Sequence, residues 1–212
     1  MKAHIEFYFD FVCPLCFLVT NPLREVIKEQ KAKIEWKPFE LCPEPAQQME
    51  QIEDFLEKPW NQSIAPLAQQ LHVEINMPSL PLVPRTHLAH EGFHFAKKHG
   101  QESAYADAVF KAYWEDEKDI SQIEVLAEIA DSLHLDKEIF TRILKERTFE
   151  QVHKNSLVYA YENAHVTEVP TLKIDSRVLK GFVSEETIEK KLLHEHSAKL
   201  KDKEKSFTKR CI

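Results

Sequence analysis

Two cysteines near the N-terminus, Cys13 and Cys16, are the side chains in this sequence whose type and spacing best suit chemistry. They flank Pro14 and Leu15 in a Cys-x-x-Cys motif that follows an apolar, aromatic-rich run. Two thiols at this spacing can close an internal disulfide, so the motif predicts thiol–disulfide exchange. In that chemistry Cys13 would attack a substrate disulfide as a thiolate, and Cys16 would resolve the mixed disulfide that results.

The sequence around the motif predicts that Cys13 lies where a strand meets a helix. Residues 4–12 indicate a buried strand, because aromatic and β-branched side chains fit a pleated surface. Pro14 favours the first turn of a helix, where its missing N–H is not needed, and residues 14–30 repeat apolar side chains at helical spacing. We therefore expect Cys13 to be an exposed nucleophile whose thiolate the helix N-terminus stabilises, and Cys16 to be shielded one turn deeper.

Metal binding is the main alternative for these residue types, and the sequence disfavours it. A structural zinc would need two more ligands at matching spacing, whereas Cys42 and Cys211 are isolated from each other. We expect Cys42 to be an inert, half-buried thiol and Cys211 to be incidental and oxidisable. A second set of ligand types, His87, His90 and His94, shares one face of a predicted helix. A polar face, or a lining of the cleft beside the cysteines, is favoured over a metal site there.

Several stretches in the same order resemble the DsbA-like thioredoxin-fold oxidoreductases. The Cys-x-x-Cys region matches the FrnE-like branch, where Asp-x-x-Cys-Pro-Trp-Cys is usual, at Asp10, Cys13, Pro14 and Cys16, while Leu15 replaces the tryptophan. The further stretches are 36–41, 84–91, 109–114 with 119–120, and 168–171. The resemblance covers about residues 4–195. It implies an α/β, thioredoxin-like fold with a large all-helical insertion.

The resemblance also implies a second element beside the cysteines, the dipeptide Val169-Pro170. In this family the equivalent bond is cis and packs against the Cys-x-x-Cys motif, so we expect the same of Val169 and Pro170 toward Cys13. The backbone of Val169 would then be free to pair with an extended substrate strand. From spacing alone, Pro170 could equally be a trans proline that starts an edge strand.

The order of predicted elements divides the chain into two domains and a tail. Residues 33–39 alternate as a second strand, parallel to the first, and 170–174 with 177–179 predict a hairpin around Asp175-Ser176. We predict a thioredoxin-like domain from residues 1–42 plus 166–196, a helical insertion from 43–165, and a flexible tail from 197–212.

The insertion carries several helix signals. Helices are expected at 86–99 and 102–116, with a capping box at Ser121 and Glu124 before the next one, and with Thr148 and Gln151 opening the last. Proline-rich stretches at 42–45 and 77–84 separate these segments.

Composition excludes some classes of function. The 212 residues are 43% hydrophobic and 30% charged, with a net charge of −7, which argues against a nucleic-acid binder. No run approaches the roughly 18–20 apolar residues needed to span a bilayer, and the N-terminus does not read as a signal peptide. We expect a cytoplasmic protein in which four cysteines serve a redox pair rather than a disulfide scaffold.

Three residues near the motif invite a supporting role. Leu15 can neither donate a hydrogen bond nor place charge near sulfur, so we expect a disulfide nearer to thioredoxin, at about −270 mV, than to DsbA, at about −120 mV. Asp10 could accept the proton of Cys16 or pair with a base, although fixing the strand-to-helix turn through backbone N–H groups is slightly favoured. Glu6, on the strand face opposite Phe7, is a weaker candidate for a proton relay.

Three functions compete. The favoured one is a protein disulfide oxidoreductase, acting as a reductase or isomerase, with protein or small-molecule disulfides and a cellular thiol as partners. It needs no bound cofactor beyond its redox-active disulfide, and glutathione is a candidate co-substrate. The first residues also look like hydroxychromene-carboxylate isomerase and kappa transferase relatives, which usually have serine at the position of Cys13. The third is a non-catalytic peptide-binding module. The sequence leaves the oligomeric state open.

Overall fold

The computed structural model describes residues 4–46, 57–175 and 177–192, and its centre is a four-stranded mixed sheet in the order β2-β1-β3-β4. The strands are β1 (His4–Phe9), β2 (Lys33–Pro38), β3 (Thr171–Ile174) and β4 (Arg177–Lys180). β1 pairs with β2 in parallel and with β3 antiparallel, and β3 and β4 form an antiparallel hairpin. The parallel first pair and the hairpin confirm the predicted strand arrangement.

Helix α1 (Pro14–Gln30) connects β1 to β2 and begins at the predicted proline. Register pairs Phe7 with Trp36 and Phe9 with Pro38. β1 ends at Phe9, three residues earlier than predicted, because residues 11–12 form a turn in which the N–H of Cys13 donates to the carbonyl of Asp10 at 3.2 Å. That turn brings the chain from the end of the strand into the first turn of the helix.

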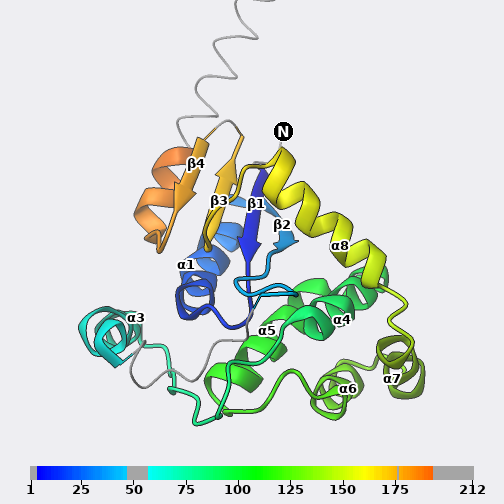
Figure 1. The fold of residues 1–212 in the computed structure, drawn as a ribbon. Helices are drawn as coiled ribbons and strands as arrows, with labels where there is room; N and C mark the ends of the chain where they lie inside the picture. Colours follow the sequence, from blue (N-terminus) through cyan, green and yellow to red (C-terminus); the bar gives the residue numbers. More distant parts are fainter. Residues whose placement is uncertain (1–3, 47–56, 176, 193–212) are drawn as a thin grey trace, which may run out of the picture.

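The described part of the chain between β2 and β3 is mainly helical, with irregular segments at 39–46 and 73–86. The helices are η1 (Trp60–Ile64), α3 (Ala65–Leu71), α4 (His87–Lys98), α5 (Glu102–Trp114), α6 (Ile123–Ser132), α7 (Lys137–Lys145), α8 (Glu150–Val158) and η2 (Tyr159–Asn163). In Figure 1, α4–α7 lie beyond the C-terminal end of β1, and α8 runs back beside the sheet. Two of these segments, η1 and η2, are short π-helices. The division into two domains stays a prediction.

Two predicted helix starts are wrong. No capping box forms at Ser121, because its N–H and hydroxyl both donate to Asp119 Oδ1, at 2.9 and 2.6 Å, and α6 begins at Ile123 without a side-chain cap. Likewise α8 begins at Glu150 rather than at Thr148. In both places a nearer hydrogen-bond partner or the preceding turn takes the groups that the cap would use.

An aromatic cluster ties the helices to one face of the sheet. The ring of Phe9 packs against those of Trp36, Phe93 and Phe110, with centroids 5.2, 5.7 and 5.9 Å apart. Such pairs contribute about 0.5–1.5 kcal/mol each beyond the area they bury. A smaller cluster covers the opposite face, from Tyr8, Phe39, Ala160, Ala164 and Val166. Both faces of the sheet are therefore covered, as an α/β fold requires.

The chain continues after the hairpin with a helix that begins at residue 185, where the carbonyl of Ser184 accepts the N–H groups of Thr187 and Ile188 at 3.0 and 3.1 Å. The predicted tail at 197–212, with Cys211, lies outside the described residues, and so does Ser176 of the predicted turn. Among the described helices, none has the length and hydrophobicity to cross a membrane.

Candidate active site

Cys13 is the N-cap residue of α1, as predicted from Pro14. Its backbone is extended, with φ −92° and ψ 112°, and its Sγ accepts the N–H of Cys16 at 3.2 Å. The sulfur therefore lies against the unpaired N–H groups at the start of the helix, where partial positive charge collects. This position favours a negative charge on the sulfur of Cys13.

Cys16 lies one turn into α1, and its side chain is fully buried. Burial raises the pKa of Cys16 well above its usual range, and the hydrogen bond with Cys13 and the charge of Asp10 act in the same direction. A hydrogen bond with the backbone of Asp10 opposes these effects without cancelling them. Cys16 is therefore a thiol at neutral pH, which makes the two sulfurs chemically unequal.

The expected exposure of Cys13 is wrong, since only 4% of the residue is accessible to solvent. The cover comes from a distant part of the chain. The Cys13 thiol donates to the carbonyl oxygen of Val169 at 3.5 Å, and the Val169–Pro170 peptide bond is cis. Pro14 and Leu15 remain partly exposed beside it. A reacting disulfide must therefore approach over Pro14 and Leu15 or move the segment that carries Val169.

Asp10 is fully buried beside the cysteines, and its carboxylate reaches away from the predicted turn. Its Oδ2 accepts the N–H of Leu41 at 2.7 Å, which joins the end of β1 to the loop after β2. Its Oδ1 lies 3.4 Å from Nε2 of His90 on α4. The favoured role of fixing the strand-to-helix turn with the side chain is wrong, because only the backbone carbonyl of Asp10 serves that turn.

The contact with His90 is one end of a buried polar cluster. The ring of His90 stacks on that of His153 from α8, with centroids 5.1 Å apart and planes 16° apart. His153 Nε2 in turn lies 2.5 Å from Oε1 of Glu40, and all three residues are buried. We call Asp10, His90, His153 and Glu40 the buried polar cluster. The sequence indicated no role for Glu40 and gave no sign of His153, since their neighbours lie far away along the chain.

The other two histidines of the predicted face fall on either side of this cluster. His94 is buried, its ring centroid is 5.9 Å from that of His153, and its Nε2 is 3.5 Å from Ser156 Oγ. His87 is partly buried, and burial lowers its pKa, as does the nearby positive charge of Arg147. The histidines of this face therefore pack in the interior between α4 and α8.

Cys42 and Glu6 occupy less central positions. Cys42 is half-buried after β2, where Arg85 donates to its carbonyl oxygen at 2.7 Å and approaches its sulfur at 3.7 Å. Glu6 lies on the sheet face opposite Phe7, as predicted, and accepts the hydroxyl of Tyr8 at 2.9 Å. Glu6 thus has a hydrogen-bond partner on its own strand.

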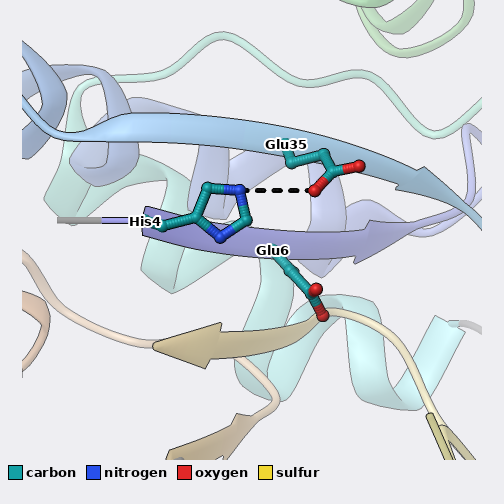
Figure 2. Close-up of side chains that lie close together, drawn as sticks. All are labelled: His4, Glu6 and Glu35. Carbon is teal, nitrogen blue, oxygen red and sulfur yellow. Dashed lines mark ion pairs between the residues drawn. The ribbon is translucent and has the colours of Figure 1, made fainter. Parts of the chain in front are cut away.

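Ligand atoms that could hold a cation gather in two other places, one on the sheet and one between helices. His4, Glu6 and Glu35 bring one ligand atom each within 4.8 Å of one another, as do Glu29, Glu185 and Glu189. Figure 2 shows the first group, on neighbouring strands, with the ion pair between His4 and Glu35 at 3.3 Å. Lys37 also donates to Glu35, at 2.7 Å, so this carboxylate is already neutralised by side chains.

Comparison with known proteins now places the chain in a family. The profile described as DSBA-like thioredoxin domain matches residues 4–193. The chain belongs to this DSBA-like family. It is also 38% identical, over 94% of its own length and all of the relative's, to the uncharacterized protein YwbO of Bacillus subtilis (strain 168). Membership confirms the predicted α/β thioredoxin-like fold, while assignment to the FrnE-like branch stays a prediction.

Solved structures of this DSBA-like fold carry different activities in their names. A probable DsbA oxidoreductase, SCO1869 of Streptomyces coelicolor, has a TM-score of 0.77 and 19% identity, covering 91% of this chain and 89% of that one. A 2-hydroxychromene-2-carboxylate isomerase has a TM-score of 0.72 and 16% identity, covering 96% of this chain and 98% of that one. The cytosolic disulfide reductase DsbM of Pseudomonas aeruginosa has a TM-score of 0.68 and 13% identity, covering 93% of this chain and 99% of that one. At such identities these likenesses establish the fold alone.

Proposed function

We propose that the protein catalyses thiol–disulfide exchange, with Cys13 as the nucleophile and Cys16 as the resolving thiol. The proposal rests on the difference in environment between the sulfurs of Cys13 and Cys16. Cys13 accepts an N–H at the start of α1, whereas Cys16 is fully buried and its pKa is raised by that burial. A sulfur at the start of a helix is placed to attack first, and a buried thiol one turn deeper is placed to resolve the mixed disulfide second.

The reaction balances over two steps. The Cys13 thiolate attacks one sulfur of a substrate disulfide, so that a mixed disulfide forms and the other substrate sulfur leaves as a thiolate. Cys16 then loses its proton and attacks the Cys13 sulfur, which closes the Cys13–Cys16 bond and releases the second substrate thiolate. The substrate disulfide gains two electrons, and the enzyme dithiol loses them. A cellular thiol returns the pair to the dithiol form.

Supporting roles follow from position. Val169 has its carbonyl on Cys13, so its backbone is placed to pair with an extended substrate at the sulfur. Pro170 brings neither an N–H nor a ligand atom to the two thiols. Leu15 offers an apolar, partly exposed surface over which the substrate reaches Cys13.

Trapping experiments test the two assignments. Cys13→Ser should abolish exchange, whereas Cys16→Ser should accumulate a mixed disulfide, because attack persists and resolution does not. Non-reducing gels with mass spectrometry report both species. If the two variants behaved alike, or if the adduct formed on Cys42, the assignment of roles would be wrong.

The proposal also includes the direction of the exchange reaction and the cellular compartment of the protein. DsbM is named a cytosolic disulfide reductase, and a structure of it with GSH is also known. We place this protein in the cytoplasm as a reductase or isomerase of disulfides, with glutathione as a candidate co-substrate. A midpoint potential near that of thioredoxin in glutathione buffers would support this direction, and one near that of DsbA would contradict it.

A glutathione-dependent isomerase is the second candidate, because a hydroxychromene-carboxylate isomerase shares the fold over nearly the whole of both chains. The pair of cysteines separates the two functions, since activating glutathione needs no resolving thiol. Isomerisation of 2-hydroxychromene-2-carboxylate by the Cys16→Ser variant at the wild-type rate would favour this candidate over exchange.

A further inference from the structure

We propose that His90, acting through Asp10, receives the proton that Cys16 must lose in the resolving step, and that His153 and Glu40 hold it in place for this. The inference rests on the proposed exchange reaction and assigns a positioning role to three residues outside the Cys-x-x-Cys motif. It starts from a chemical need, because a buried thiol cannot attack until its proton has somewhere to go.

Asp10 is the inner end of this route. Asp10 is fully buried, as Cys16 is, and its carbonyl accepts the N–H of Cys13 at 3.2 Å, so it lies beside the two cysteines. Its carboxylate charge disfavours a thiolate on Cys16. While Asp10 carries its charge alone, resolution therefore works against a like charge. A proton that moves from Cys16 to the Asp10–His90 pair removes this opposition at the moment the thiolate forms.

His90 is the group placed to share that proton. Its ring is fully buried, and its Nε2 lies 3.4 Å from Oδ1 of Asp10. Its Nδ1 has no hydrogen-bond partner among the residues that the structure describes. No other contact competes for the ring nitrogens there, so the tautomer of His90 is free to follow the charge on Asp10.

The neighbouring histidines are held neutral. Burial lowers the pKa of His153 to about 2 and that of His94 to about 3, and the other histidines reinforce both shifts. Burial also raises the pKa of Glu40, which suits one proton shared across its 2.5 Å contact with His153. His90 is the member of the stack that faces Asp10.

Several other charges face the cluster from the surrounding elements. They come from α4, from the loops that precede α4 and α8, and from α5 and η2. They are His87, Glu91, Arg85, Arg147, Tyr113 and Tyr161. Arg147 is bound to Glu91 at 2.7 Å, and the burial of Tyr113 and Tyr161 raises their pKa values. Arg147 and Glu91 form an ion pair with each other, so their charges offset one another beside the cluster.

The resolving step can be followed with a small aromatic disulfide, dithiobis(nitrobenzoate), on the full-length reduced protein. Attack by Cys13 releases one thionitrobenzoate, and attack by Cys16 releases the second as the Cys13–Cys16 bond closes. In the wild type, the rate of the second release should rise by much less than tenfold per pH unit, roughly between pH 6 and 8, because an internal base takes the proton. A slope of about tenfold per unit in the wild type would overturn the proposal without any variant.

His90→Gln keeps an N–H donor toward Asp10 and removes the titrating ring. It should slow the second release by about 10²-fold at neutral pH and give it the steep pH dependence, with the first release unchanged. The control His94→Gln, on the same face of α4 but without a carboxylate partner, should behave as wild type. Asp10→Asn should slow the second release as well.

The outcomes separate the two proposals. If the wild type released no second thionitrobenzoate, the exchange function itself would fail. If it did so and His90→Gln retained both rate and slope, His90 would have no part in proton transfer. Equal slowing in His94→Gln would point to loosened packing and would also overturn the assignment.

Discussion

Gly92, in the middle of α4, offers a test of how the helices pack, because its neighbours leave no room for a methyl group. A Cβ at this position would overlap Oη of Tyr105 on α5 and lie 2.7 Å from Cζ of Phe140 on α7. Both rings are fully buried, so neither can swing away into solvent. The change Gly92→Ala should therefore destabilise the fold despite alanine's better helix propensity.

The magnitude follows from two opposed effects. Alanine in a helix interior gains about 1 kcal/mol over glycine. Overpacking in a well-packed core costs about 1–3 kcal/mol, and contact with two immobile rings places this site at the upper end. The net loss should be about 2 kcal/mol, which in a chain of this size lowers Tm by roughly 4–8 °C.

A double-mutant cycle identifies the contact. Tyr105→Phe removes the oxygen that the new methyl would meet, and that hydroxyl has no hydrogen-bond partner among the described residues. Tyr105→Phe should be near neutral alone and should recover about 1 kcal/mol in the Gly92→Ala background. Urea unfolding of the four proteins measures the coupling.

Gly100 supplies the matched control. It has φ of +70° and no atom within 4 Å of an added Cβ. Gly100→Ala should therefore destabilise through the backbone alone, by about 1 kcal/mol, and show no coupling to Tyr105→Phe. A stabilised Gly92→Ala, or a coupling energy near zero, would refute the packing of α4 against α5 and α7.

Two further outcomes are expected. Removing one partner of a fully buried ion pair costs about 3–5 kcal/mol of stability. Arg147→Met should cost somewhat less, because Glu91 is buried while the Arg147 side chain is 35% exposed. Burial raises the pKa of Glu91, and Arg147 opposes that shift. The loss of stability in Arg147→Met should therefore be full above the raised pKa of Glu91 and should shrink as pH falls, which unfolding experiments across pH can measure. The control Arg24→Met, at an exposed ion pair, should cost under about 1 kcal/mol at every pH. Alkylation of Cys16 should be slow at neutral pH, because burial raises the pKa of this thiol. It should accelerate only at a pH well above the pKa of a free thiol. Mass spectrometry that found Cys16 labelled as fast as in an unfolded control would contradict this.

The strand–helix–strand unit was predictable because its signals are local. Pro14 marks the helix start, and the aromatic run marks the strand before it. Helix α7 carries similar local signals, since Asp136 caps it by accepting the N–H of Ile139 at 2.9 Å, and Phe140, Ile143 and Leu144 follow at helical spacing. The capping box at Ser121 failed because Asp119, two residues earlier, is a better acceptor for the same groups.

What the sequence could not show is where distant segments meet. Cys13 is covered by Val169, which is 156 residues further along the chain, so its burial has no local signal. The partners in the buried polar cluster are separated by 80 and 113 residues. Helical spacing singled out His90 as one of three equivalent histidines, and only the fold distinguishes it by placing Asp10 against it.

The position of the buried polar cluster ties the helices to the chemistry. Titratable groups are expensive to bury, and apolar side chains of similar size could join α4 and α8 to the sheet at least as firmly. The rings of Phe9 and Phe11 already pack on the ring of His90, with centroid distances of 5.4 Å for Phe9 and 4.7 Å for Phe11, and so connect α4 to this part of the chain. Stability alone therefore gives no reason for Asp10, His90, His153 and Glu40 to stand there, whereas a thiol that must give up a proton away from solvent does.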